Sequence, residues 1–124
     1  MQNEEAGFLR SEWSKFADRC RWSWEGWLIV WREESSVKQW VFANIISAGF
    51  ALTLDLSPVE RALIIALGVL ILAAECFNTA IERCVDYTSP AHHPLAKAAK
   101  DCGSAAVAIT AIAAGLAWLI ILFG

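Results

Sequence analysis

The sequence lacks several patterns by which common protein classes are recognised. Its four cysteines form no C-x-x-C pair and no zinc-type spacing, so we expect them to be reduced and structural. It contains neither G-x-x-x-x-G-K-[ST] nor a kinase glycine loop, which excludes the common nucleotide-binding folds. The net charge is −3 and no basic stripe occurs, so no nucleic-acid partner is expected. Residues 1–31 contain no continuous apolar segment, which argues against a cleavable signal peptide.

Apolar residues are what the sequence has in excess. They make up 57% of the 124 residues, and the mean hydropathy is +0.46. A soluble domain of this length cannot bury so much apolar surface. The composition therefore predicts a membrane protein, and the length predicts a single domain, 1–124.

Helical patterns fill most of the chain. Over about 7–34, aromatic and aliphatic residues recur every three or four positions with charges between them, which predicts an amphipathic helix in the headgroup layer. Ser57 and Glu60 have the spacing of a capping box at a helix start. Three further segments are apolar and long enough to cross a membrane, at about 37–54, 60–86 and 94–123. The sequence thus predicts an all-α membrane protein with one amphipathic surface helix and three transmembrane helices.

Basic residues are distributed unevenly around the predicted spans. Six Lys or Arg residues lie before the apolar part of the first span, which begins at Val41, one lies between it and the apolar part of the second span, which begins at Ala62, three lie around the next connection, and none follows the third span. This distribution predicts a cytoplasmic N-terminus and a C-terminus outside. The third span is rich in alanine, which permits close helix packing, and three helices alone make a thin bundle. We therefore expect the chain to self-associate.

Polar residues share one face at the end of the second predicted span. At about 100° per residue, Asn78, Glu82 and Asp86 lie roughly 60°, 20° and 20° from the direction of Glu75. Burying a carboxylate near hydrocarbon costs on the order of several kcal/mol, and no basic residue lies within one turn of Glu75. Glu75 is therefore a functional candidate. For Glu82 and Asp86 alone, a solvated helix end explains the residues equally well.

The third predicted span carries a second polar face at the same membrane level. Lys97, Lys100, Asp101 and Ser104 recur at i, i+3, i+4 and i+7, so the two faces can meet. Carboxylates for magnesium, a lysine for phosphate and a deeper carboxylate for a proton together suit phosphoryl transfer. His93, in the adjoining turn, is a candidate contact to a nucleotide. The alternative is that Lys100 only neutralises a nearby acid.

Two motifs in these spans occur together in one known family. The first reads E-C-F-N-T-A-I-E-R-C-V-D from Glu75 to Asp86, and the second, after His93, reads A-K-D-C-G-S-A-A-V from Ala99 to Val107. With a surface helix and three spans, the chain resembles the small bacterial integral-membrane diacylglycerol kinases over nearly its whole length. The resemblance implies a homotrimer with shared active sites in the bacterial cytoplasmic (inner) membrane. It also implies transfer of the γ-phosphoryl group of magnesium ATP to the primary hydroxyl of diacylglycerol, giving phosphatidic acid.

The resemblance also implies roles for single residues. Glu75 looks like the general base, and Glu34 and Glu82 look like the ligands of Mg²⁺. Trp22 stands where the family has a tyrosine near the adenine, and Trp40 replaces an acid at the start of the first span, which puts base stacking and lipid entry in doubt. The ATP contacts carried over are Arg10, Trp22, Glu34, Asn78, Glu82, Asp86, His93, Lys100 and Asp101. The lipid contacts carried over are Arg10, Lys38, Gln39, Glu75 and Ser104.

Three alternatives stay open. A relative in the same superfamily phosphorylates undecaprenol, and 93–97 resembles that branch, whereas 103–106 favours diacylglycerol. A small oligomeric channel or proton carrier would turn Glu75 toward a pore, but 62–74 and 107–123 offer almost no polar lining. A non-enzymatic membrane scaffold would leave the intramembrane carboxylate unexplained.

Overall fold

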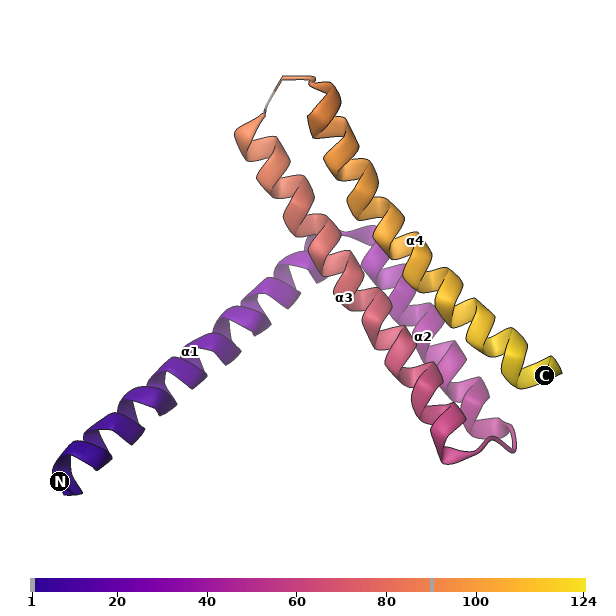
Figure 1. Cartoon of the computed structure of the whole chain (residues 1–124), viewed down its shortest axis with the longest axis horizontal. Coiled ribbons are helices and arrows are strands. Elements are labelled where there is room, and N and C mark those ends of the chain that lie inside the picture. Colours follow the sequence, from indigo (N-terminus) through magenta and orange to yellow (C-terminus); the bar gives the residue numbers. More distant parts are fainter. Residues whose placement is uncertain (1, 90) are drawn as a thin grey trace. The chain divides into compact units, whose positions relative to one another are not determined.

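The computed structural model describes residues 2–89 and 91–124, with side chains from Arg10 onward. These residues form four helices and no strand, which confirms the all-α expectation (Figure 1). The helices are α1 (Gln2–Glu33), α2 (Ser35–Thr53), α3 (Pro58–Thr88) and α4 (Pro94–Phe123). α1 forms one compact unit, and residues 34–124 form a second.

α1 is a long helix with paired aromatic side chains. Trp13 packs edge-on against Phe16 with 5.9 Å between ring centroids, and Trp27 lies 6.2 Å from Trp31. Exposed ion pairs one turn apart, such as that of Lys15 with Glu12, lie along the same helix. Tryptophan suits the headgroup region because its ring is apolar and its N–H needs a polar partner. A position of α1 in the headgroup layer stays a prediction.

Two helices of the described residues, α3 and α4, are long and apolar enough to cross a membrane. Within the chain, only 22% and 6% of their most apolar segments are buried, so they do not resemble the core helices of a soluble domain. α2 has 19 residues, which gives it a length of about 28 Å, but its first half is more polar. The prediction that α2 also spans the membrane is therefore still open.

α3 is the central helix of the second unit and contacts both α2 and α4. Asn44 Nδ2 on α2 donates to the Gly68 carbonyl on α3 over 2.8 Å, and a Cβ at Gly68 would lie only 2.7 Å from Asn44 Oδ1. The absence of a side chain at Gly68 thus permits the close approach. Trp118 Nε1 on α4 donates to Ser47 Oγ on α2 over 2.8 Å. Polar side chains therefore tie the three helices together where their surroundings are otherwise apolar.

The second unit has a small apolar core. Most large apolar side chains on the outer faces of α2, α3 and α4 are exposed. In one chain these faces need lipid or further subunits to cover them. The buried apolar residues of this unit are Val37, Ala51, Ile64, Ile71, Val107 and Ala117.

The turn between α2 and α3 is held by side chains from the start of α3. Ser57 Oγ accepts from the Glu60 N–H over 3.3 Å, and Glu60 Oε2 accepts from the Ser57 N–H over 2.7 Å, which confirms the predicted capping box. Arg61 Nε donates to the Ala51 carbonyl over 3.2 Å, and its Nη2 group donates to two carbonyls of the turn. Carbonyls at a helix end have no helical partner. Arg61 therefore caps the end of α2.

Replacing Arg61 should destabilise the fold without touching the site. In Arg61→Ala, unpaired carbonyls are expected to lower the free energy of unfolding by about 1–3 kcal/mol, seen as a lower thermal midpoint in detergent. Arg61→Lys should fall between wild type and Arg61→Ala because a single ammonium lacks the fixed fork of donors. Equal midpoints for all three proteins would contradict the capping role.

The N-terminus of α2 lies beside the middle of α3, and α3 and α4 run on past it to their connecting turn (Figure 1). We call this projecting part, residues 76–89 and 91–104, the α3–α4 extension. In α3 it amounts to about 20 Å of helix beyond Glu75. Most of the predicted site residues of α3 and α4 lie on it.

Candidate active site

Glu75 is almost fully buried, with 4% of its surface exposed, where α3 passes the first turn of α2. Ser36 Oγ, on that turn, donates to Glu75 Oε2 over 3.2 Å. A buried carboxylate is costly unless a donor meets it, and a hydroxyl is such a donor. Sequence reasoning missed Ser36, because a lone serine 39 positions before Glu75 has no pattern that marks it as a partner.

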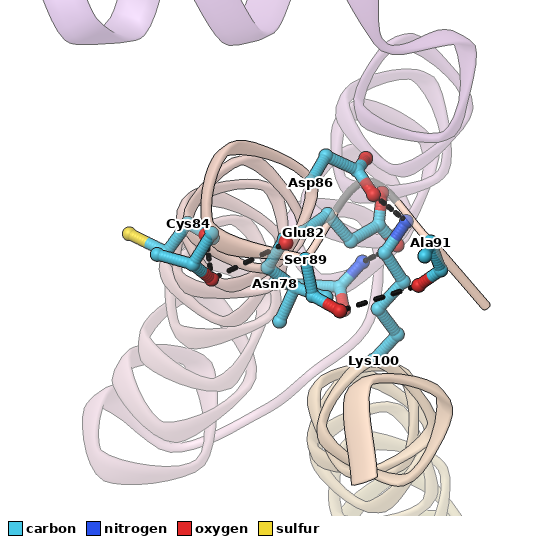
Figure 2. Close-up of polar contacts among 9 residues, drawn as sticks. Asn78, Glu82, Cys84, Asp86, Ser89, Ala91 and Lys100 are labelled. Atoms are coloured by element: carbon cyan, nitrogen blue, oxygen red, sulfur yellow. Dashed lines mark hydrogen bonds and ion pairs between the residues drawn. The ribbon is translucent and has the colours of Figure 1, made fainter. Parts of the chain in front are cut away.

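One turn further along α3, Asn78 Nδ2 donates to Glu82 Oε1 over 3.2 Å (Figure 2). Asn78 Oδ1 points the other way and is buried, and none of the described residues forms a hydrogen bond with it. A Cβ at Gly103 on α4 would clash with this oxygen. The bare backbone at Gly103 therefore leaves the space in which the Asn78 amide lies, with its NH₂ group toward the Glu82 carboxylate.

The predicted polar faces of α3 and α4 meet at an ion pair. Lys100 Nζ lies 2.6 Å from Asp86 Oδ1, and about a third of the Lys100 side chain is exposed (Figure 2). Asp101, by contrast, pairs with Lys97 on an exposed surface of α4. Such an exposed pair contributes about 0–1 kcal/mol to stability. Lys100 and Asp86 are thus brought together, and Asp101 is turned toward a different neighbour.

An open cleft of about 750 Å³ lies at the end of the α3–α4 extension. His93 is the N-cap of α4, and its Nδ1 accepts from the Leu95 N–H over 3.2 Å. A neutral imidazole that accepts at Nδ1 carries its proton on Nε2, which can donate to an anion. The polar residues that line the cleft are Asp86, Ser89, His92, His93, Lys97 and Lys100.

The remaining predicted site residues belong to several segments of the chain. Glu34 directly precedes α2 in extended conformation, is partly exposed, and its side chain makes no capping hydrogen bond. The others are exposed on three helices. They are Arg10 and Trp22 on α1, Lys38 and Gln39 on α2, and Ser104 on α4.

The part of the chain that the structure describes contains no cluster of three or more His, Cys, Asp or Glu that would form a ready-made metal site. The proposed ligands Glu34 and Glu82 are carboxylates, which are hard oxygen donors of the kind Mg²⁺ prefers. Mg²⁺ keeps several waters and usually takes one or two carboxylates together with substrate phosphates. The donor set therefore fits a metal that is bound together with a nucleotide.

Apolar helices long enough to cross a membrane, a buried carboxylate, and a cleft with lysines and histidines about 15 Å further along α3 indicate the class: a membrane protein with a candidate site for phosphoryl transfer. A family model described as prokaryotic diacylglycerol kinase matches residues 21–122. The chain belongs to the prokaryotic diacylglycerol kinase family, as its motifs indicated.

Individual relatives support this membership. A diacylglycerol kinase of Pseudomonas aeruginosa is 45% identical over 105 residues, covering 83% of this chain and 84% of the relative. A diacylglycerol kinase of Escherichia coli strain K12 is 34% identical over 123 residues, covering 99% and 97%. A diacylglycerol kinase of Helicobacter pylori is 37% identical over 97 residues, covering 78% and 76%. The similarity thus extends over more than three quarters of this chain and of each relative.

Proposed function

We infer that this chain is a diacylglycerol kinase, which phosphorylates the primary hydroxyl of diacylglycerol with ATP at the cytoplasmic surface of the membrane. The depth of Glu75 carries this inference. About 26 Å of helix separates Pro58 from Glu75, close to the roughly 30 Å of a bilayer's hydrocarbon core. With Pro58 at the outer boundary, Glu75 lies just beneath the inner headgroups, at the level of the hydroxyl of a diacylglycerol.

Glu75 acts as the general base in this proposal. It takes the proton of the lipid hydroxyl as the oxygen attacks the γ-phosphorus. The bond from that phosphorus to the bridging oxygen of the β-phosphate breaks, ADP leaves, and the proton passes from Glu75 to water after transfer. Phosphoryl transfer of this kind depends mostly on positioning and on charge stabilisation.

The nucleotide occupies the α3–α4 extension. Lys100, held 2.6 Å from Asp86, is available to exchange that partner for a phosphate oxygen. His93, whose Nδ1 accepts from the Leu95 N–H, lines the same cleft. Asp101, Arg10 and Trp22 remain candidates for further ATP contacts. Lys38, Gln39, Ser104 and Arg10 remain candidates for lipid contacts.

Glu34 and Glu82 are the proposed ligands of Mg²⁺. When bound, the metal neutralises charge on the phosphate oxygens. Asn78 supports this role because its NH₂ group donates to Glu82 Oε1 and so orients the carboxylate. The Asn78 amide, in turn, is confined by Gly103.

The proposal includes a homotrimer of three-span subunits with shared active sites in the bacterial inner membrane. Exposed apolar faces on α2, α3 and α4 support association, because one chain leaves them uncovered. Five basic residues lie before α2, and Arg83, Lys97 and Lys100 lie near the facing ends of α3 and α4, a distribution that supports a cytoplasmic N-terminus and a C-terminus outside.

A side-by-side assay tests the function. Purified protein in mixed micelles with magnesium ATP should phosphorylate diacylglycerol, and undecaprenol presented to the same preparation should be the poorer acceptor. Removal of Mg²⁺ with a chelator should stop turnover, and re-addition should restore it. An equal or reversed acceptor preference would contradict the substrate assignment and leave a lipid kinase, whereas no transfer to either acceptor would contradict the function itself.

The close contact of Gly103 with Asn78 predicts different kinetics for alanine substitutions at two glycines of α4. Gly103→Ala should push the Asn78 amide away from Glu82, and we expect a loss of activity of about 10- to 100-fold with a raised KM for magnesium ATP. Gly115→Ala is the matched control on the same helix, because a Cβ there meets no atom of the described residues within 4 Å. Equal kinetics for the two variants would show that Gly103 does not act through Asn78.

A further inference from the structure

Ser36 lies outside the two family motifs and contacts the buried carboxylate of the site. Its Oγ donates to Glu75 Oε2 over 3.2 Å from the neighbouring helix. We propose that Ser36 is a positioning residue, which holds Oε2 of Glu75 so that Oε1 faces the acceptor hydroxyl. This inference rests on the proposed function, in which Glu75 receives the proton.

A glutamate carboxylate needs such a constraint. The torsion that turns its two oxygens is broad and nearly free, unlike the staggered torsions nearer the backbone. Packing around Glu75 fixes where the group lies, but a directional hydrogen bond fixes which way its plane faces. A single donor on one oxygen therefore selects the orientation in which the other oxygen can accept a proton.

The donor itself stands on a rigid part of the chain. Ser36 belongs to the first turn of α2, and the next residue, Val37, is fully buried with 0% exposure. Serine has one side-chain torsion, so ordering its hydroxyl costs little entropy. Glu34, a proposed magnesium ligand, lies two residues before Ser36 at the same helix start. This turn of α2 therefore serves both the acceptor side and the nucleotide side of the reaction.

A purely structural role for Ser36 predicts different behaviour. If the hydroxyl only satisfies a buried carboxylate, its loss lowers stability and leaves turnover intact at temperatures well below unfolding. If it positions Glu75, its loss lowers kcat while the KM for magnesium ATP stays the same, because the Ser36 hydroxyl donates to the proposed base and not to a proposed nucleotide ligand. Stability and the two kinetic constants are therefore measured on the same preparations.

Three substitutions at Ser36 and one beside it form the test. Ser36→Ala should lower kcat for diacylglycerol by about 10- to 100-fold with the KM for magnesium ATP within about twofold of wild type. Ser36→Thr keeps the hydroxyl and should retain most of the activity. Ser36→Cys, nearly the same size but a weaker donor, should lie between them. Ser35→Ala removes an adjacent, exposed serine and should match wild type.

The outcomes separate this inference from the function on which it rests. Loss of kcat in Ser36→Ala with recovery in Ser36→Thr supports positioning. If Ser36→Ala turns over like Ser35→Ala, or if only its thermal midpoint changes, the positioning role is wrong although the kinase assignment stands. Should Ser36→Ala fail to fold, Ser36→Cys and Ser36→Thr decide the matter, and equal kcat values for these two would contradict the proposal. An inactive wild-type protein would instead contradict the proposed function.

Discussion

Glu75→Gln is expected to lower kcat for diacylglycerol phosphorylation by about 10²- to 10⁴-fold, the range that general-base catalysis supplies. Glutamine has nearly the same shape, and its amide oxygen can still accept from Ser36 Oγ, so the contact between α2 and α3 is retained. Because the neutral amide cannot take the proton of the lipid hydroxyl, the loss should lie in the chemical step. Initial rates in mixed micelles at saturating ATP and diacylglycerol measure it.

Assembly and stability serve as the controls for this variant. Glu75→Gln should elute in size-exclusion chromatography like wild type and unfold at a similar or higher temperature, because a buried charge has been removed. Glu60→Gln is a matched substitution near the start of α3, where glutamine preserves the capping box. More than a tenth of wild-type kcat in correctly assembled Glu75→Gln would show that Glu75 is not the base.

Glu82→Gln should produce the second large effect, a fall in kcat/KM for magnesium ATP of about 100-fold or more. The amide oxygen of glutamine can keep the hydrogen bond from Asn78, but the negative charge that attracts a divalent cation is lost. The KM for magnesium ATP should therefore rise, while the KM for diacylglycerol stays near that of wild type. A titration of rate against free Mg²⁺ should need a higher concentration for half-maximal activity.

The kinetic pattern distinguishes Glu82 from Glu75. Loss of the base lowers kcat without changing nucleotide affinity, whereas loss of a metal ligand lowers affinity for the metal-nucleotide complex as well. An unchanged Mg²⁺ dependence in Glu82→Gln would remove Glu82 from the proposed metal ligands, even if activity fell.

Local patterns predicted much of the secondary structure. The capping box joins Ser57 to Glu60, three positions further along the chain. Its geometry follows from this spacing, and the structure contains it. The shared face of α3 follows from helical periodicity, and the ion pair of Lys100 with Asp86 shows that the two predicted polar faces meet. These features depend on spacing within one helix or on the common level of two helices.

Contacts that depend on how helices are rotated against each other were not predictable in this way. Ser36 meets Glu75 only because α2 presents its first turn to one side of α3. Gly103 matters because α4 approaches Asn78 closely, and no periodicity in the sequence encodes that distance. Lys97 and Asp101, which the spacing placed with Lys100, pair with each other on an exposed surface instead. Packing between helices, rather than the pattern along them, settles such pairings.

The α3–α4 extension divides the reaction between two solvents. In the proposed arrangement, the charged and imidazole side chains of the site lie two or more helical turns beyond Glu75, on the aqueous side, while the carboxylate of Glu75 lies at the edge of the hydrocarbon layer. The lipid acceptor need not leave the bilayer, and ATP need not enter it. Only the phosphoryl group crosses the boundary between water and hydrocarbon. A chain this short cannot enclose either reactant on its own. In this scheme the surrounding lipid excludes water from the side of the active site that the protein leaves open.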